Sequence, residues 1–206
     1  APFGQDYAVV AGRELAADFL QGFRFSAEDV QYLGGLTGSN GQPLFNEAFL
    51  NYLQRMTFRC DVHAMPEGSV AFPHQPLLRV EGPLLQCQLI ETVLLTLVNY
   101  STLIATKSAR IVREAQGDSV LEFGMRQTQW IDGSSTAARS DYIGGCHATS
   151  NVKAGQLYRI PVKGTHAHSW VMCFGDELEA FRRYAEALPN NCIFLVDTYD
   201  SLAGVE

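Results

Sequence analysis

The chain has 206 residues, 47% of them hydrophobic, and a formal net charge of −7. A chain of this size can bury one sizeable core and carry a smaller lobe beside it. Its charges are interspersed and form no basic run, which argues against general nucleic-acid binding, although an acidic protein can keep a local cationic pocket for an anionic small molecule.

The cysteines and the apolar segments predict a protein that resides in the reducing cytoplasm. The five cysteines are scattered and contain no CxxC pair, which argues against a disulfide framework and against a structural zinc site. No charged and apolar leader opens the sequence. The longest apolar stretch, residues 84–100, contains Glu91 and other polar residues, so we expect a buried helix there and not a membrane span.

Residues 1–116 are predicted to form an α+β lobe that begins with helices. The run ELAADFLQ is a helix signal. Ser26 and Asp29 have the spacing of a capping box, and Asn46 is expected to be the N-cap of a third helix.

The rest of this lobe changes from strand to helix periodicity. Residues 58–82 contain three short runs of period two, separated by turn residues, and predict a small β module. Residues 83–114 predict one long helix. At 1.5 Å per residue it would be roughly 45 Å long, so we expect a kink near residues 99–101.

Residues 117–206 alternate between strand and helix signals, which indicates parallel βαβ units. The predicted strands are VLEFG from Val120, YIGGC from Tyr142, RIPVKG from Arg159 and CIFLVDT from Cys192. The predicted helices between them are SSTAARSDY, SNVKAGQLY and DELEAFRRYAEAL. The predicted fold class is α/β: the first half of an irregular α/β barrel, carrying the active site, preceded by a smaller α+β sandwich lobe.

Polar side chains follow the predicted strands at one end. Such strand ends meet at one mouth of a barrel, where α/β proteins bind ligands. Ser150 is also expected to be a helix N-cap, where free backbone N–H groups favour an anion. Ser150 as a cap alone, and Arg126 as a salt-bridge partner alone, remain open alternatives. The candidate residues are Phe123, Arg126, His147, Thr149, Ser150, Asn151, Lys163, Thr165, His166, His168, Asp197 and Asp200.

His166 and His168 allow three interpretations. Two apart on a strand, they would point the same way and could bind a metal, as the HxH of barrel hydrolases does. A neutral imidazole could instead accept or orient a phosphoryl group while a carboxylate or carbonyl holds its other nitrogen. A structural histidine is the third interpretation.

Four motifs occur in the order and spacing of one known family: EFGxR from Glu122, TSNV from Thr149, GTxAHSW from Gly164, and LVDTYD from Leu195. With the run from Asp61 to Arg110, they make nearly the whole chain resemble nicotinate phosphoribosyltransferase, a type II phosphoribosyltransferase. The resemblance implies that nicotinate and phosphoribosyl pyrophosphate are converted to nicotinate mononucleotide and pyrophosphate, coupled to ATP hydrolysis, in NAD salvage.

The resemblance also implies residue roles. His168 matches the histidine that ATP transiently phosphorylates, whereas the position of His166 is variable in the family. Phe123 matches the aromatic that stacks on the pyridine ring, and Arg126 the cation near carboxylate and phosphate. Thr165 matches a nicotinate contact. Ser150 lies where the nicotinamide enzyme has an Asp, which fits a site for a carboxylate.

By the same resemblance we expect a cytoplasmic homodimer whose subunits share the active site. Its substrates would be small molecules, with Mg²⁺ accompanying ATP and phosphoribosyl pyrophosphate and no tightly bound cofactor. Gln127 and the run QWIDGSS depart from the family pattern, which affects the loop after Arg126. The family has segments on both sides of the matched region, so the 206 residues look like a fragment that would be inactive alone.

Two functions of other classes remain open on the sequence. One is a metal-dependent hydrolase on a barrel, using His166 and His168. The other is a non-catalytic protein that binds NAD precursors as a sensor or scaffold.

Overall fold

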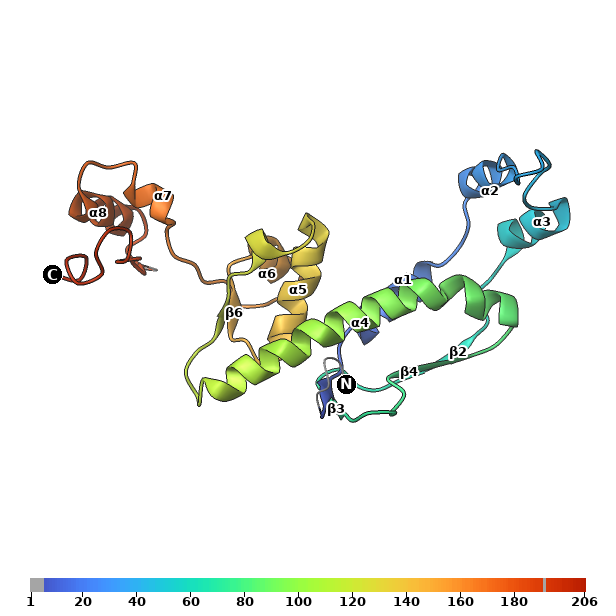
Figure 1. The fold of residues 1–206 in the computed structure, drawn as a ribbon, viewed down its shortest axis with the longest axis horizontal. Helices are drawn as coiled ribbons and strands as arrows, with labels where there is room; N and C mark the ends of the chain where they lie inside the picture. The colour runs from blue at the N-terminus through green and yellow to red at the C-terminus, as the bar shows by residue number, and fades with distance from the viewer. Residues whose placement is uncertain (1–5, 191) are drawn as a thin grey trace. The chain divides into compact units, whose positions relative to one another are not determined.

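The chain divides into two compact units, Ala1–Lys107 and Ser108–Glu206. The fold is that of a computed structural model, which describes residues 6–190 and 192–206 (Figure 1). The division falls inside a long helix, α4 (Leu84–Glu114), whereas the sequence predicts a boundary at residue 116, after that helix.

The first unit contains three short helices: α1 (Arg13–Gly22), α2 (Ala27–Gly34) and α3 (Glu47–Arg55). The capping box predicted for α2 is confirmed, because the Asp29 N–H donates to Ser26 Oγ and the Ser26 N–H donates back to Asp29 Oδ2. Asn46 caps α3 as predicted, its Oδ1 accepting the Phe49 N–H at 2.8 Å. These caps satisfy N–H groups that have no partner within the helix.

The strands of this unit form two separate antiparallel pairs and not one module. They are β1 (Ala8–Val9), β2 (Asp61–Ala64), β3 (Val70–Ala71) and β4 (Leu78–Glu81). β2 pairs with β4, with Val62 opposite Val80, while β3 pairs with β1. The sequence predicts the three strands within residues 58–82 correctly but misses β1.

Helix α4 runs for 31 residues and continues through residues 99–101, so the predicted kink does not break it (Figure 1). Its length and apolar composition are also those of a membrane-crossing segment. However, two buried hydroxyls in its middle bind the backbone beside β1. Thr106 Oγ1 accepts the Val9 N–H at 2.9 Å, and Thr102 Oγ1 accepts the Ala11 N–H and donates to the Ala11 carbonyl. These contacts are those of a core helix packed on a neighbouring segment.

The core of the first unit lies where α1 packs on α4. Ala16 and Leu20 of α1 are buried against Ile90 and Leu94 of α4. Gly12, which begins α1, has φ +96, and a Cβ there would lie 2.6 Å from the Leu97 carbonyl oxygen. Only glycine permits both this backbone conformation and this close approach of the two helices.

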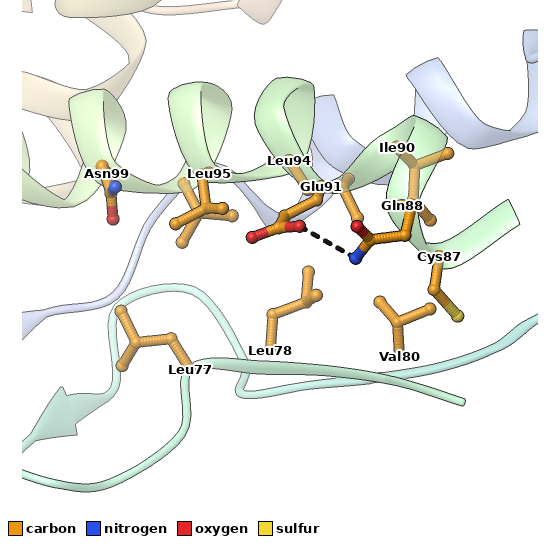
Figure 2. A pocket seen from close by; sticks show the side chains of 11 residues that line it. Leu77, Leu78, Val80, Cys87, Gln88, Ile90, Glu91, Leu94, Leu95 and Asn99 are labelled. Atoms are coloured by element: carbon orange, nitrogen blue, oxygen red, sulfur yellow. Dashed lines mark hydrogen bonds between the residues drawn. The ribbon is translucent and has the colours of Figure 1, made fainter. Parts of the chain in front are cut away.

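A cavity of about 540 Å³ lies in the first unit between β4 and α4. Figure 2 shows its mostly apolar lining, crossed by a hydrogen bond from Gln88 Nε2 to Glu91 Oε2 at 3.3 Å. The residues that line it do not include any side chain predicted for the active site. The carboxylate of Glu91 therefore has a hydrogen-bond donor within the lining of this cavity.

The second unit contains short parallel strands followed by helices, as predicted. β5 (Leu121–Glu122) pairs with β6 (Ala148–Thr149), and Thr149 forms a parallel bridge with Val162. Two further helices belong to this part: α5 (Ile131–Ile143) and α6 (Val152–Tyr158). The three strand segments therefore lie side by side in chain order, although each is shorter than predicted.

Two predicted strands of the second unit are wrong. Residues 142–146 are not a strand, because α5 continues to Ile143 and the chain then turns at Gly145, whose φ is +107. Residues 192–198 form no strand in the described part of the chain, and the Leu195 N–H donates to a side chain there. The described residues have mixed helix and strand content and form no closed barrel. The expectation that residues 117–206 form the first half of an α/β barrel stays a prediction.

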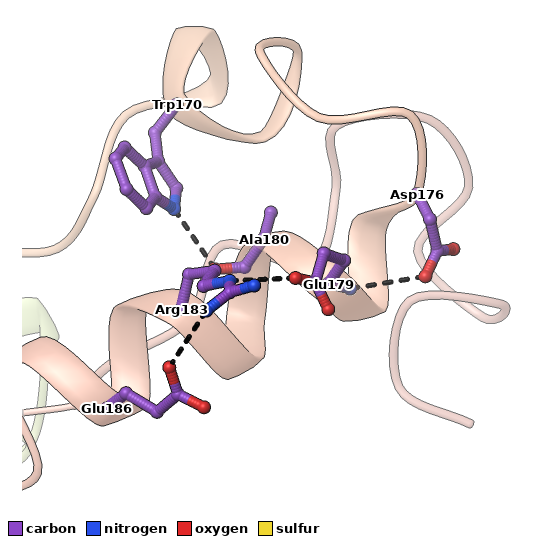
Figure 3. Close-up of polar contacts among 6 residues, drawn as sticks. All are labelled: Trp170, Asp176, Glu179, Ala180, Arg183 and Glu186. Carbon is purple, nitrogen blue, oxygen red and sulfur yellow. Dashed lines mark hydrogen bonds and ion pairs between the residues drawn. The ribbon is translucent and has the colours of Figure 1, made fainter.

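The unit ends with a short helix packed on a longer one. These are α7 (His168–Val171) and α8 (Glu177–Ala187). Val171 of α7 is buried against Ala180 and Phe181 of α8. Trp170 Nε1 donates to the Ala180 carbonyl at 3.1 Å, which fixes the orientation of α7 (Figure 3). His168, the first residue of α7, therefore lies on a helix that is held against α8.

Candidate active site

Phe123 and Arg126 lie immediately after β5. Phe123 is 42% exposed. Arg126 lies in a single 3-10 turn, η2 (Met125–Gln127), and within the described residues its exposed guanidinium forms no ion pair. An exposed ring next to an unpaired cation can take a flat anionic ligand, by stacking and by charge.

Ser150 lies at the end of the neighbouring strand, beside the β5 turn. Its backbone N–H donates to the Glu122 carbonyl at 2.9 Å, which brings it next to Phe123. The prediction that Ser150 caps the following helix is wrong by one residue. The cap of α6 is Asn151, whose Oδ1 accepts the Ala154 N–H at 3.0 Å. The Ser150 side chain is thereby available for a ligand.

A buried polar network supports this strand end. Two of its members, Thr149 and Asn151, are among the residues predicted at the strand ends, but their contacts are not predicted. Thr149 is fully buried, and its hydroxyl donates to Glu122 Oε2. The Asn151 N–H donates to Thr149 Oγ1 at 3.0 Å, and Asn151 Nδ2 donates to Ser134 Oγ at 3.2 Å. The network ties the β5 and β6 ends to the first turn of α5. Only the short TSN sequence, common in helix caps, could have indicated it.

His168 lies at the start of α7 with its imidazole exposed and not packed into a core. Its Nε2 lies 3.0 Å from Asp197 Oδ1. Because the carboxylate can only accept, Nε2 carries the proton, and in the neutral ring Nδ1 then has the lone pair. The sequence places Asp197 among the candidate residues at the strand ends but does not pair it with His168, since a pairing across 29 positions has no local signal.

The hydrogen bond from His168 lowers the pKa of the Asp197 carboxyl below its ordinary value of 3.8. A donor aimed at the charged form of an acid favours ionisation. Asp197 is therefore a carboxylate at neutral pH, and it can stabilise positive charge that develops on the His168 ring.

His166 has a different environment from His168, although the two are only two residues apart. It is buried, with its ring 4.9 Å from that of Tyr184 and 5.6 Å from that of Phe181. The Leu195 N–H donates to its Nε2 at 3.1 Å, which occupies that lone pair. His166 is therefore a structural histidine.

This environment contradicts a metal site built on His166 and His168. A ligand nitrogen must offer its lone pair to the metal, and that of His166 Nε2 is already used. Within residues 6–190 and 192–206, no three His, Cys, Asp or Glu side chains are grouped as a metal site would need. The hydrolase alternative has no support from the geometry.

Thr165 precedes the two histidines and is half-buried. Its Oγ1 donates to the His166 carbonyl at 2.9 Å, which leaves the lone pairs of the hydroxyl for a donor. The predicted residues thus lie in two groups: Phe123 with Arg126 and Ser150 at the β5–β6 end, and Thr165 with His168 and Asp197 near α7. That both groups face one opening stays a prediction.

Comparison with known proteins gives these residues a family context. Residues 1–99 match the N-terminal domain model of nicotinate phosphoribosyltransferase. The nicotinate phosphoribosyltransferase of Bacillus subtilis is 46% identical over 201 residues, which cover 98% of this chain and 40% of the relative.

Two solved structures are similar to this one. The human nicotinic acid phosphoribosyltransferase is 36% identical, with a TM-score of 0.83 over 97% of this chain and 49% of the human one. Nicotinate-nucleotide pyrophosphorylase from Pyrococcus furiosus is 26% identical, with a TM-score of 0.71 over 96% of this chain and 42% of that one.

The Bacillus relative matches almost all of this chain, including the strand ends and the histidine segment described above. The chain spans well under half the length of the curated relatives it matches. Over nearly all of its length the chain is similar to nicotinate phosphoribosyltransferases.

Proposed function

We propose that the natural protein containing this chain is a nicotinate phosphoribosyltransferase. It converts nicotinate and phosphoribosyl pyrophosphate to nicotinate mononucleotide and pyrophosphate, with ATP hydrolysis coupled to the transfer. The observation that carries the proposal is the exposed imidazole of His168, hydrogen-bonded through Nε2 to the Asp197 carboxylate at 3.0 Å. A neutral ring oriented in this way is suited to accept a phosphoryl group.

That geometry supports the following phosphoryl transfer step. Nδ1 of His168 attacks the γ-phosphorus of ATP, the N–P bond forms, and the bond between that phosphorus and the bridging oxygen of ADP breaks. The ring gains positive charge as Nδ1 bonds, and Asp197 stabilises it through the Nε2 proton. Later hydrolysis of the N–P bond releases phosphate and restores the imidazole.

The glycosyl transfer step makes different demands. Breaking the bond between C1′ and pyrophosphate builds positive charge on the ribose and negative charge on the leaving group, so fixed cations and oriented donors matter more than a strong base. We assign Phe123 to stacking on the pyridine ring, Arg126 to the anionic groups, and Ser150 and Thr165 to hydrogen bonds with nicotinate. The exposure of Phe123 and the unpaired guanidinium of Arg126 support these roles.

Magnesium would enter with the phosphates of ATP and phosphoribosyl pyrophosphate and not as a resident ion. Mg²⁺ is commonly held by substrate phosphates and one or two carboxylates, and it would neutralise phosphate charge there. Asp197 is a carboxylate that the structure places beside His168, and its lowered pKa keeps it ionised for such a role. We propose no tightly bound cofactor.

We further propose a cytoplasmic homodimer with an active site shared between subunits. The 206 residues alone are expected to be inactive, since they cover only 40% of the Bacillus relative. Synthesis of nicotinate mononucleotide by the purified 206-residue chain would contradict that expectation.

The test of the function is an assay of the full natural protein. Incubation with nicotinate, phosphoribosyl pyrophosphate, Mg²⁺ and ATP should give nicotinate mononucleotide and ADP, detected by liquid chromatography and mass spectrometry. Parallel reactions with nicotinamide and quinolinate test the choice of base. Binding of nicotinate without any product would contradict catalysis and would favour a sensor or scaffold.

A further inference from the structure

Glu122 is a half-buried carboxylate next to the candidate site, and the proposed mechanism gives it no role. Glu122 lies opposite Thr149 in the β5–β6 strand pair. Within the described part of the chain, it forms no ion pair with a Lys or Arg. A carboxylate in this position needs hydrogen-bond donors to replace water.

Two donors meet the two oxygens of this carboxylate. The Gly124 N–H donates to Glu122 Oε1, and the Thr149 hydroxyl donates to Oε2. The hydroxyl in turn accepts the Asn151 N–H at 3.0 Å. The side chain of Glu122 therefore links the turn after β5 to the turn after β6.

The number of hydrogen-bond donors that face Glu122 constrains the residue type at this position. Both partners donate, and the Thr149 hydroxyl has only one proton to give, so two acceptor oxygens are required. A glutamine has one acceptor and one NH₂ group. In one orientation, the glutamine would place its NH₂ group opposite the Gly124 N–H. In the other, it would leave the proton of the Thr149 hydroxyl without an acceptor.

The link fixes the residues that the proposed function uses. Phe123 lies between Glu122 and Gly124, so the bond to Gly124 holds the peptide that follows the ring. Arg126 lies in η2, which begins directly after Gly124. Ser150 lies between Thr149 and Asn151, and its own N–H donates to the Glu122 carbonyl at 2.9 Å.

We propose that Glu122 is a positioning residue that sets the spacing of Phe123 and Arg126 from Ser150, and thereby the fit of nicotinate. This inference depends on the proposed function. It also explains why a carboxylate is tolerated beside a site for anionic substrates, because both of its oxygens are engaged by internal donors. Glu122 itself does not touch the substrate.

The test compares three variants of the full natural protein with one control. Glu122→Gln and Thr149→Val each remove one side of the link, whereas Thr149→Ser keeps the hydroxyl. The control is Glu186→Gln, which removes an exposed carboxylate of α8 that lies 3.5 Å from Arg183 Nη1 (Figure 3). Thermal unfolding first establishes that each variant is folded.

The expected result is a rise in the KM for nicotinate of roughly ten- to a hundredfold in Glu122→Gln and Thr149→Val, with a smaller change in kcat, since misplaced binding groups weaken the fit of the substrate. Thr149→Ser and Glu186→Gln should keep the original KM. An unchanged KM in Glu122→Gln would overturn the proposal.

Hydrogen–deuterium exchange of the peptide containing Gly124 gives a readout that does not depend on catalysis. Exchange should be at least roughly tenfold faster in Glu122→Gln, because an amide that loses its acceptor loses its protection. Equal exchange would overturn the link even if the KM changed. If the unsubstituted protein makes no nicotinate mononucleotide, the proposed function fails, and this exchange measurement alone decides whether Glu122 holds the turn.

Discussion

At the scale of single residues, the two neighbouring histidines show how environment assigns a role. His166 and His168 belong to the same segment, yet His166 is buried among aromatic rings and His168 is exposed and bound to Asp197. The sequence resemblance selects His168 from a motif. The structure adds a physical reason: of these two histidines, His168 is the exposed one, whereas Nε2 of His166 accepts the Leu195 N–H.

The histidines should differ in their effect on stability. His166→Ala leaves a cavity among packed rings and removes the acceptor for the Leu195 N–H, so we expect it to lower the free energy of unfolding by about 2 kcal/mol or more. His168→Ala removes an exposed side chain and should change the free energy of unfolding by less than about 0.5 kcal/mol. Urea unfolding of both variants measures this. Equal destabilisation would contradict the assignment of His166 to the core.

The link between His168 and Asp197 predicts a pH effect with a definite sign. A lowered pKa means that the folded state binds the Asp197 proton more weakly than the unfolded state does. The stabilisation is therefore complete above the ordinary pKa of 3.8 and is lost as the pH falls through the lower folded value. Because Asp197 is exposed, the effect on stability is small.

Carbon-13 NMR of labelled aspartate can measure this pKa directly. In the full natural protein, the Asp197 carboxyl should titrate below 3.8, and in His168→Ala it should return towards that ordinary value. A pKa for Asp197 that is the same in both proteins would show that His168 does not donate to it.

At the scale of elements, helices were predicted better than strands, for a physical reason. A helix satisfies its backbone locally, so caps such as Ser26 and Asn46 mark its start in the sequence. A strand needs a partner that is distant in the chain. Residues 192–198 have the composition of a strand, but in the described structure they lack a neighbouring strand with which to pair.

The candidate site shows the same division between local and distant information. The predicted residues Phe123, Arg126 and His168 were found from motifs, each within one short run of sequence. The pairs Glu122–Thr149 and His168–Asp197 join residues 27 and 29 positions apart, and no local pattern encodes which of many carboxylates will be the partner. The error of one residue at Ser150 came from two adjacent cap-forming side chains.

The packing of α6 on the strand end can be tested by a pair of helical glycines. A Cβ on Gly155 would lie 2.3 Å from Val162 Cγ2 and 3.1 Å from the Ile160 carbonyl oxygen, so Gly155→Ala should destabilise by about 1–3 kcal/mol. Gly22, at the end of α1, has nothing within 4 Å of a built Cβ. Gly22→Ala should be neutral or stabilising by up to about 1 kcal/mol. Thermal unfolding distinguishes the two, and equal effects would contradict the close contact at Gly155.

At the scale of the whole molecule, charge limits how the proposed substrates are bound. The chain carries 15 Lys and Arg residues against 22 Asp and Glu residues, so its overall field does not attract polyphosphates. Within this chain, the proposed binding of ATP and phosphoribosyl pyrophosphate would therefore depend on local groups such as Arg126, on backbone donors and on the accompanying Mg²⁺. Phosphorylation of His168 would add one more local charge able to organise cations.

The central claim is that ATP phosphorylates His168, and mass analysis of the peptide that contains it tests this most directly. The full natural protein is incubated with ATP and Mg²⁺, digested under conditions that preserve phosphohistidine, and compared with the His168→Ala variant. We predict one added phosphoryl group on His168 and none on the variant. ATP turnover with an unmodified His168, or the phosphoryl group on another residue, would contradict the account.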